Sequence, residues 1–278
     1  MKKFSVLVTG GKGVVGSYFS SFPGTYLATH ADFDVRNYKK TRAFIRSCSP
    51  ITIIHLAAAT NVDQCEREPQ LAYDTNLVGT YNIAKVASEI NAHLIYVCTS
   101  GVFPGTGNIP YTTRRKPNPP SVYTRSKYMG EIVCRDLVKK LTIARTGWVF
   151  GGGKEDKKFV GMIMGQIQSG SKKILAVSDV YGCPTYAKDL ADTLWTMHIE
   201  KKYGLFHVVN QGQASRYEIA KEIIKISGGK VRVMKASVHD FPSFNAPRPQ
   251  FEVIQPNVKL RHWKSALREY LDIWQIKK

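Results

Sequence analysis

The chain has 278 residues, of which 43% are hydrophobic and 11% aromatic, enough for one large domain or for a core domain with a smaller lobe. This composition excludes a disordered chain, and no apolar run approaches the ~20 residues that a membrane-spanning helix needs. The net charge of +19 has three possible explanations, namely binding to nucleic acid, binding to anionic small molecules, or a lysine-rich source proteome. The lysines are scattered, and the sequence has no zinc-finger spacing and no RNP-like motif. We therefore expect no dedicated nucleic-acid partner.

The cysteines and histidines indicate a compartment and argue against a metal. Five cysteines, an odd number without a C-x-x-C pair, are typical of buried thiols in a reducing compartment, so we expect a cytoplasmic protein. The seven histidines show no close ligand spacing, and no catalytic metal is predicted. Met1-Lys2-Lys3 begins like a signal peptide, but the apolar run that follows is too short for one and indicates a first strand.

The first half of the chain alternates strand-like and helix-like segments. Short apolar runs predict strands at Phe4–Thr9, Thr25–Thr29, Ile51–Leu56 and His93–Cys98. Apolar residues at helical spacing predict helices from the first glycines to about Ser21, over Asn37–Cys48 and over Leu71–Asn91. This alternation predicts an α/β fold with a doubly wound, Rossmann-type parallel sheet that has helices on both faces.

The second half is less regular. The proline-rich stretch 104–120 predicts a long loop, and long loops in compact domains are often functional. A helix over Tyr123–Lys139 and a strand over Leu141–Arg145 follow, and after the three glycines 151–153 the alternation ends. We therefore expect a sheet domain over 1–147, with part of 183–210 returning to it, and a smaller lobe made mainly of 148–182 and 211–278.

A glycine-rich loop, Gly10–Gly16, follows the first predicted strand and fits G-x-x-G-x-x-G as well as G-x-G-x-x-G. Glycine lets the chain turn sharply from strand to helix and lets the backbone approach a pyrophosphate with no Cβ in the way. The N–H groups and the positive dipole end of the next helix would also face the phosphates. The position of this loop after the first strand predicts a dinucleotide-binding domain over 1–147.

The end of the second predicted strand bears on the choice between the two nicotinamide cofactors. A site that prefers NAD usually carries an acid there for the ribose 2′-hydroxyl, but this chain has Ala28-Thr29-His30. Lys12, His30 and Arg36 are close enough in sequence to face a 2′-phosphate. This favours NADPH, with NADH as the alternative, because Asp32 or Asp34 could still serve the ribose.

The motif Y-x-x-x-K occurs three times, at Tyr81/Lys85, Tyr123/Lys127 and Tyr217/Lys221, and its context separates the three. Tyr81 lies mid-helix on an apolar stripe and is expected in the core, whereas Tyr217 is expected in a surface pair. Tyr123 begins a helix after the proline-rich loop, 24 residues beyond Thr99 at the end of a predicted strand, where such folds bind ligands.

The spacing of Tyr123 and Lys127 suits acid–base chemistry, because positions i and i+4 share a helix face. A neighbouring ammonium would lower the phenol pKa from ~10 toward the working pH. Tyr123 would then be a general acid for a carbonyl oxygen that receives a hydride, or a base in reverse. Thr99 would offer a hydroxyl hydrogen bond to the same oxygen.

These residues, with others along the chain, resemble the extended short-chain dehydrogenases/reductases and, among them, the dTDP-4-dehydrorhamnose reductase family. The similarity covers nearly the whole chain. Ala57–Glu66 resembles the family segment A-A-x-T-x-V-D-x-x-E, and Ala72–Asn76 resembles A-x-x-x-N. Arg145–Phe150 resembles R-T-S-W-V-Y, Gly182–Thr185 resembles G-x-P-T and is followed by Asp189, and 247–249 resembles a late R-P segment.

The resemblance implies a role for each matching position. The catalytic group would be Thr99, Tyr123 and Lys127. The cofactor would contact Gly10, Lys12, Gly13, Val14, Val15, Asp34, Val35, Ala57, Ala58, Ala59, Asn76, Tyr123 and Lys127. The nucleotide sugar would contact Thr60, Val62, Thr99, Ser100, Trp148 and Arg248, the last approaching the phosphates. The alternatives are that Trp148 belongs to the core and that Arg248 forms a surface ion pair.

One segment departs from the family pattern. Cys98–Gly105 stands where the family has S-T-D-Y-V-F-D-G, so Ser100 and Gly101 replace an acidic and an aromatic residue. Those side chains would lie beside the sugar, and we therefore expect a smaller, less polar pocket wall here. The three catalytic residues are unchanged in this segment and its partners, so the catalytic chemistry is still expected. The departure leaves the identity of the substrate undetermined.

Together these observations predict an NADPH-dependent reductase that acts on the C4 keto group of a nucleotide-linked 4-keto-6-deoxy sugar, as in dTDP-rhamnose and polysaccharide biosynthesis. One alternative is another extended reductase, an epimerase or a dehydratase acting on a nucleotide sugar. Ser100 and Gly101 argue against a dehydratase, which usually needs an acid/base pair near the catalytic threonine. A second alternative is a regulatory subunit of the methionine adenosyltransferase type.

A homodimer formed through helices is expected, since such folds often pair in this way.

Overall fold

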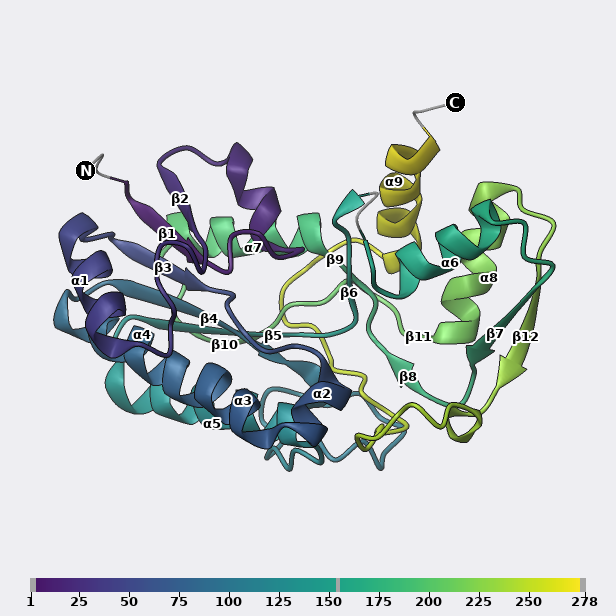
Figure 1. Ribbon diagram of the computed structural model, residues 1–278, viewed down its shortest axis with the longest axis horizontal. Helices are drawn as coiled ribbons and strands as arrows, with labels where there is room; N and C mark the ends of the chain where they lie inside the picture. The colour runs from purple at the N-terminus through teal and green to yellow at the C-terminus, as the bar shows by residue number, and fades with distance from the viewer. Residues whose placement is uncertain (1–3, 154–155, 276–278) are drawn as a thin grey trace.

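A six-stranded parallel sheet, in the order β10-β5-β4-β3-β1-β2, forms the larger part of the computed structural model, which describes residues 4–153 and 156–275 (Figure 1). Every neighbouring pair of strands runs parallel. The strands are β1 (Val6–Thr9), β2 (Thr25–Ala28), β3 (Thr52–His55), β4 (His93–Thr99), β5 (Leu141–Thr146) and β10 (Gly204–His207). The chain leaves β1 for β2 at one edge and returns on the other side of β1 to form β3, and in such sheets ligands bind at this point of reversal.

Helices cover both faces of the sheet, and two hydrophobic clusters lie between the layers. One face carries α1 (Tyr38–Cys48), α4 (Gly79–Glu89) and α5 (Val122–Leu137), and the other carries α7 (Ala187–Ile199) with the short 3-10 helix Gly16–Ser21 (Figure 1). The interior strands are buried on both faces, as parallel sheets require. The predicted fold class is confirmed.

The helix predicted after the glycine loop is only a 3-10 helix, Gly16–Ser21. Three serines explain why it stays short, because their hydroxyls donate to carbonyls three residues back and compete with a regular helix: Ser17 to Val14, Ser20 to Ser17 and Ser21 to Tyr18. Pro23 then prevents any continuation. The dipole expected at this helix terminus is correspondingly small.

The single helix predicted over Leu71–Asn91 is divided into α3 (Pro69–Tyr73), a π-helical turn (Asp74–Val78) and α4, and α2 (Val62–Arg67) precedes it. The π-helical turn contains Asn76, whose side chain leaves the helix to bind the backbone of Ala59. Such turns are frequent at functional sites because they redirect a side chain. A mixed segment of this kind has the same apolar spacing as one long helix, so the sequence alone does not reveal the break.

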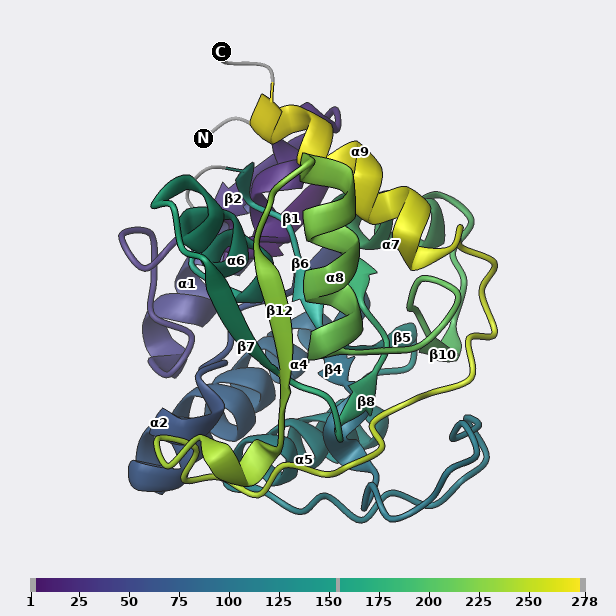
Figure 2. The same cartoon turned by 90° about the vertical axis from the view of Figure 1, so that its right-hand side faces the viewer.

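A smaller group of elements lies beside the carboxyl end of the sheet and encloses its own hydrophobic cluster (Figure 2). Its two-stranded parallel sheet pairs β7 (Lys173–Val177) with β12 (Arg232–Ala236). Its helices are α6 (Phe159–Gln168), α8 (Arg216–Ser227) and α9 (Trp263–Gln275). Short strands connect the two groups, namely β6 (Val149–Phe150) with β9 (Thr185–Tyr186) and β8 (Tyr181–Gly182) with β11 (Ala214–Ser215).

A buried ion pair connects α5 with β5. Arg145 and Glu131 are almost completely buried, and the guanidinium donates to both carboxylate oxygens, at 3.0 and 2.7 Å. Arg135, which is half exposed, donates to the same carboxylate at 2.9 Å. Arg145 immediately precedes the turn that carries Trp148, so this pair fixes the helix that bears Tyr123 against the strand that leads to Trp148.

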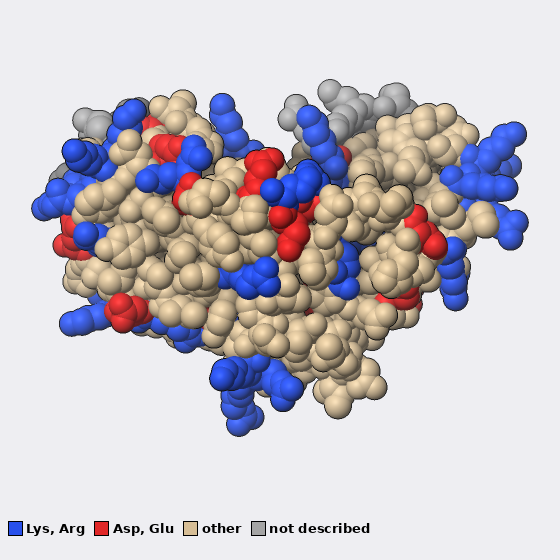
Figure 3. Space-filling view, turned by 60° about the horizontal axis from the view of Figure 1, so that its bottom comes forward, with Lys and Arg blue, Asp and Glu red and all other residues tan. Residues whose placement is uncertain are grey.

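Two features of the structure concern binding to nucleic acid and to membranes. Lys and Arg side chains form several small groups over the face shown in Figure 3 and do not gather into one stripe. Among the described helices, none is both long and apolar enough to cross a bilayer.

Candidate functional site

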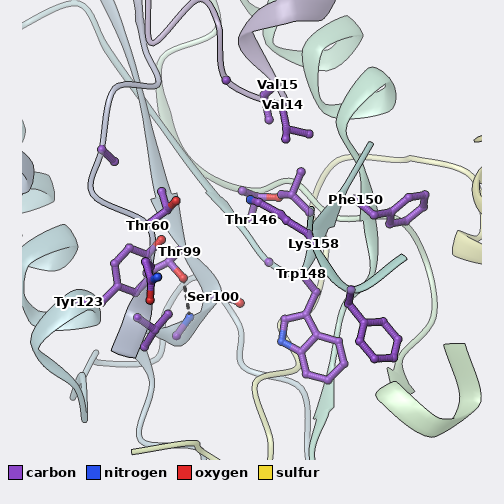
Figure 4. A pocket seen from close by; sticks show the side chains of 18 of the residues that line it. Val14, Val15, Thr60, Thr99, Ser100, Tyr123, Thr146, Trp148, Phe150 and Lys158 are labelled. Carbon is purple, nitrogen blue, oxygen red and sulfur yellow. Dashed lines mark hydrogen bonds between the residues drawn. The ribbon is translucent and has the colours of Figure 1, made fainter. Parts of the chain in front are cut away.

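A cavity of about 1330 Å³ opens where the carboxyl ends of the parallel strands face the smaller group of elements. Single small-molecule sites usually measure ~300–1,000 Å³, so this one has room for two ligands. The segments that follow β1, β3 and β4 form one side of it, and Trp148 faces them from the opposite side, with Val14 and Val15 above (Figure 4).

The glycine loop lines this cavity with its backbone. Gly10 has φ +70°, and a Cβ there would lie 2.9 Å from the backbone nitrogen of Ala57. At Gly16 a Cβ would lie 2.4 Å from the carbonyl oxygen of Gly10. Both positions therefore require glycine, as expected of a backbone that approaches a pyrophosphate closely.

A buried chain of three polar side chains holds this loop against β3. The Thr9 hydroxyl lies 2.7 Å from His55 Nδ1, and His55 Nε2 lies 3.1 Å from the Thr80 hydroxyl. Thr9 Oγ1 also accepts from the backbone N–H groups of Leu56 and Ala57. Burial lowers the pKa of His55 to about 3, so the ring stays neutral and acts as a fixed connector between the two hydroxyls.

Basic side chains rather than a free carboxylate line the cavity near the end of β2. Lys12 and His30 line the wall. The Asp32 carboxylate instead accepts hydrogen bonds from the Tyr26 hydroxyl, at 2.6 Å, and from the backbone N–H and hydroxyl of Thr29. These bonds stabilise the turn between Thr29 and Asp32. Neither Asp34 nor Arg36 lines the cavity, because they pair with each other at 2.6 Å.

The first turn of α5 places Tyr123 at the cavity. Ser121 caps the helix and exchanges hydrogen bonds with Thr124, while Glu66 of α2 accepts from the N–H of Val122 at 3.0 Å. Tyr123 points toward Thr99 at the end of β4 (Figure 4), and Lys127, 3% exposed, lies one turn further along the helix. The Lys127 ammonium lies 4.4 Å from the centre of the Tyr96 ring.

The electrostatics of this group differ from the expectation. Burial raises the pKa of the Tyr123 phenol well above its usual value, and the hydrogen bond to Thr99 only partly opposes this effect. Burial lowers the pKa of the Lys127 ammonium to about 8. The prediction that Lys127 brings the Tyr123 pKa down toward the working pH is therefore wrong, because desolvation of the phenolate has the larger effect.

Trp148 is held rigidly in the opposite wall. Its backbone adopts a left-handed conformation, φ +45°, which is unusual for an aromatic residue and marks a position over-determined by its surroundings. The indole packs so closely on Gly182 that a Cβ there would lie 2.3 Å from it. The Arg216 guanidinium covers the ring at 4.0 Å, a cation–π contact. Trp148 is therefore part of the site wall.

The wall beside Thr99 is not the less polar surface that Ser100 and Gly101 predict. Ser100 is fully buried and packs against Gly147. A Cβ on Gly101 would lie 2.7 Å from Cγ2 of Thr124 and 3.6 Å from Oε1 of Glu252, so both side chains border this part of the wall. Glu252 Oε2 accepts from the indole nitrogen of Trp148 at 2.8 Å. Burial raises the pKa of this carboxyl, and Trp148, Arg216 and Arg248 oppose the rise. The expected less polar wall is thus wrong, because a carboxylate from a distant segment occupies it.

Most of the predicted site residues meet at this one cavity. Those that line it are Gly10, Lys12, Gly13, Val14, Val15, Val35, Ala57, Ala58, Thr60, Val62, Thr99, Ser100, Tyr123, Lys127, Trp148 and Arg248. Asp34, Ala59 and Asn76 do not line it. Asn76 is fully buried and holds Ala59 and Ser126 from behind, which makes it a positioning residue for the wall.

Two residues that line the cavity were not predicted from the sequence, namely Arg216 of α8 and Glu252 of the segment between β12 and α9. Neither belongs to a motif, and both come from the irregular second half, where no periodicity shows which side chains face inward. Arg248 lines the cavity and also pairs with Asp63 at 2.6 Å. Tyr81, expected in the core, is 41% exposed, whereas Tyr217 and Lys221 do form a neighbouring pair, 5.6 Å from ammonium to ring.

This arrangement of glycine loop, tyrosine, lysine and tryptophan has known counterparts. A family model described as the RmlD substrate binding domain matches residues 4–276. The chain belongs to this family. Since the match spans both the sheet and the smaller group of elements, it covers every residue that lines the cavity.

Relatives in the RmlD family agree over most of their length. The spore coat polysaccharide biosynthesis protein SpsK of Bacillus subtilis is 33% identical over 86% of this chain and 84% of its own. The dTDP-4-dehydrorhamnose reductase of Mycolicibacterium smegmatis is 30% identical over 95% of this chain and 84% of its own. The crystal structure of the dTDP-4-dehydrorhamnose reductase of Bacillus anthracis in complex with NADP is 30% identical and superposes with a TM-score of 0.92, covering 98% of this chain and 99% of that one.

Proposed function

We propose that this protein is an NADPH-dependent reductase of the C4 keto group of a nucleotide-linked 4-keto-6-deoxy sugar, with dTDP-4-dehydrorhamnose as its substrate. The observation that carries the proposal is the meeting of Thr99, Tyr123 and Lys127 with the glycine loop in one cavity large enough for two ligands. The reductases among its relatives at about 30% identity support the same activity.

The cavity fits a dinucleotide, since the glycine loop lines it with backbone, and Gly10 and Gly16 allow the tight packing that holds this loop in place, as in a pyrophosphate-binding turn. Lys12 of the glycine loop and His30 after β2 suit a 2′-phosphate, and Asp32 and Asp34 are engaged elsewhere, which supports NADPH over NADH. Bound NADPH supplies the hydride. We further propose that residues 1–147, with part of 183–210, hold the cofactor and that 148–182 and 211–278 mainly hold the sugar nucleotide.

The residues of the chain provide the proton and the orientation. Tyr123 donates its phenolic proton to the C4 oxygen as charge develops there, and the Thr99 hydroxyl hydrogen-bonds the same oxygen. Because the pKa of Tyr123 is raised, the phenol stays protonated and is a donor in the reductive direction. Lys127, on the same side of α5, supplies a positive charge that stabilises the phenolate formed when the proton leaves. Trp148 covers the opposite side of the sugar.

The pH dependence should report Lys127. With its pKa lowered to about 8, the ammonium loses its proton above that pH and can no longer stabilise the phenolate. We expect kcat/KM to be flat below pH ~8 and then to fall about tenfold per pH unit, since this parameter follows the free enzyme. Initial rates of NADPH oxidation between pH 6 and 10 measure it, and a plateau that extends to pH 10 would contradict this role of the lysine.

The function is tested by following NADPH oxidation with dTDP- and UDP-linked 4-keto-6-deoxy sugars. The proposal expects turnover with dTDP-4-dehydrorhamnose and a lower kcat/KM with NADH in place of NADPH. Release of an epimer or of a dehydrated sugar without net NADPH oxidation would favour an epimerase or a dehydratase. Tight NADPH binding without turnover of any donor would favour a regulatory subunit of the methionine adenosyltransferase type.

We propose that two copies of this chain pair through α4 and α5. These helices lie side by side, and four apolar side chains that are 41–48% exposed lie on or next to them, namely Val78, Tyr81, Met129 and Ile132. Covering such a patch is the usual reason for a helix-mediated dimer. Sedimentation velocity should give twice the 31.2 kDa of one chain, and Ile132→Lys should shift the equilibrium to the monomer. A wild-type monomer at micromolar concentration would rule the dimer out.

We also propose a cytoplasmic location. All five cysteines are free and buried, with no disulfide between them, which is typical of proteins from a reducing compartment.

A further inference from the structure

Glu252 is a carboxylate that the mechanism above does not use, although it lies beside the reacting group. It follows the segment that carries Arg248, and its backbone N–H donates to the Tyr181 carbonyl at 2.8 Å, which fixes it to β8. Its side chain is partly exposed, and it lines the cavity. The neighbouring Phe251 N–H donates to the Gly105 carbonyl at 3.2 Å, and Phe251 and Val253 belong to a hydrophobic cluster of the sheet, so both parts of the structure set the position of Glu252.

The two carboxylate oxygens have different surroundings. Oε2 accepts the hydrogen bond of the Trp148 indole at 2.8 Å, whereas Oε1 has no hydrogen-bond partner among residues 4–153 and 156–275. Oε1 and the Thr99 hydroxyl both lie within 3.6 Å of the point that a Cβ on Gly101 would occupy. A carboxylate oxygen without a partner thus faces the same space as the hydroxyl that marks the position of the C4 oxygen.

The chemistry of the substrate limits what Oε1 can meet there. In a 4-keto-6-deoxy sugar the neighbours of C4 are C3, which carries a hydroxyl, and C5, which carries a methyl group and the ring oxygen. Only the C3 substituent can donate a hydrogen bond to a carboxylate. We propose that Glu252 is a specificity-determining residue that accepts a hydrogen bond from the C3 hydroxyl of the sugar, an inference that rests on the proposed function.

The small residues Ser100 and Gly101 explain why the carboxylate beside Thr99 comes from Glu252 and not from the segment that follows β4. Ser100 is 1% exposed and packs on Gly147, so no larger acidic side chain fits at that position without displacing the backbone. A Cβ on Gly101 would lie 2.7 Å from Cγ2 of Thr124 and 3.6 Å from Oε1 of Glu252, so the missing side chain leaves this part of the wall to Thr124 and Glu252. The guanidinium groups of Arg216 and Arg248 offset part of the charge of Glu252, which makes a carboxylate tolerable in a site that we propose to hold phosphates as well.

Glu252→Gln tests this inference, because the amide oxygen can still accept from Trp148 while the charged acceptor for the sugar is lost. We would measure kcat/KM for dTDP-4-dehydrorhamnose and for its 3-deoxy analogue, with the exposed Glu200→Gln as a matched control. A charge-assisted hydrogen bond is worth roughly a 10- to 100-fold effect. We expect a loss of that size on the first substrate, less than about twofold on the analogue, and an unchanged Kd for NADPH.

Three outcomes are distinguishable. A loss confined to the substrate with the C3 hydroxyl supports the inference. An equal loss on both substrates, or no loss on either, overturns it while the proposed reductase activity stands. If the wild-type protein reduces neither substrate, the proposed function fails and the assignment of Glu252 fails with it.

Discussion

Tyr123→Phe should lower kcat by about 10²- to 10⁴-fold, because it removes the only proton that this account delivers to the C4 oxygen. The ring still fills its place in the first turn of α5, which Ser121 and Glu66 fix independently of the hydroxyl. NADPH should therefore bind with an affinity within a few-fold of the wild type. Initial-rate kinetics and a fluorescence titration with NADPH separate the two effects.

The chain offers a matched control for this variant. Tyr217→Phe removes a hydroxyl from another Y-x-x-x-K pair, in α8, that does not line the cavity, and it should leave kcat unchanged. Turnover by Tyr123→Phe within a factor of about two of the wild type would remove this tyrosine from the mechanism. A parallel loss of NADPH affinity would instead indicate that the hydroxyl serves binding.

Arg145→Leu should lower the free energy of unfolding by about 3–5 kcal/mol, because it leaves the carboxylate of Glu131 buried with only the half-exposed Arg135 as partner. In the double variant Arg145→Leu/Glu131→Leu the uncompensated charge is gone, and much of the stability should return. Urea unfolding followed by circular dichroism measures both, provided that the transition is two-state.

Lys188→Leu is the control, since its ion pair with Asp192 spans one helical turn on the surface and should contribute only about 0.3–0.5 kcal/mol. If Arg145→Leu were no more destabilising than Lys188→Leu, the buried pair would not hold α5 against β5. Because Arg145 precedes Trp148 by three residues, we also expect the single variant to lose turnover before it loses its fold.

The sheet and the cofactor side of the cavity were predictable because they rest on local signals. Apolar runs mark the buried strands, and the glycines at 10 and 16 occupy positions where a Cβ would collide with backbone atoms. Tyr123 and Thr99 were identifiable because parallel strands and helix starts bring such residues to one edge. These inferences need only the order of the elements.

The sugar side was less predictable because it depends on contacts between distant segments. Glu252 meets Trp148 across 104 residues of chain, and no periodicity predicts that pairing. The pKa of Tyr123 was predicted in the wrong direction because sequence spacing reveals its neighbour Lys127 but not the depth of burial, which has the larger effect. Asn76 was assigned to the cofactor from its motif, whereas the structure places it behind Ala59.

The decisive measurement is the transfer of deuterium to dTDP-4-dehydrorhamnose from NADPH that carries deuterium at both positions of the nicotinamide C4. We expect one deuterium at C4 of the sugar product, detected by NMR, in an amount equal to the NADPH oxidised, and about 10²- to 10⁴-fold less of it when Tyr123→Phe replaces the wild type over the same interval. An unlabelled product, or oxidised NADPH without a reduced sugar, would contradict it.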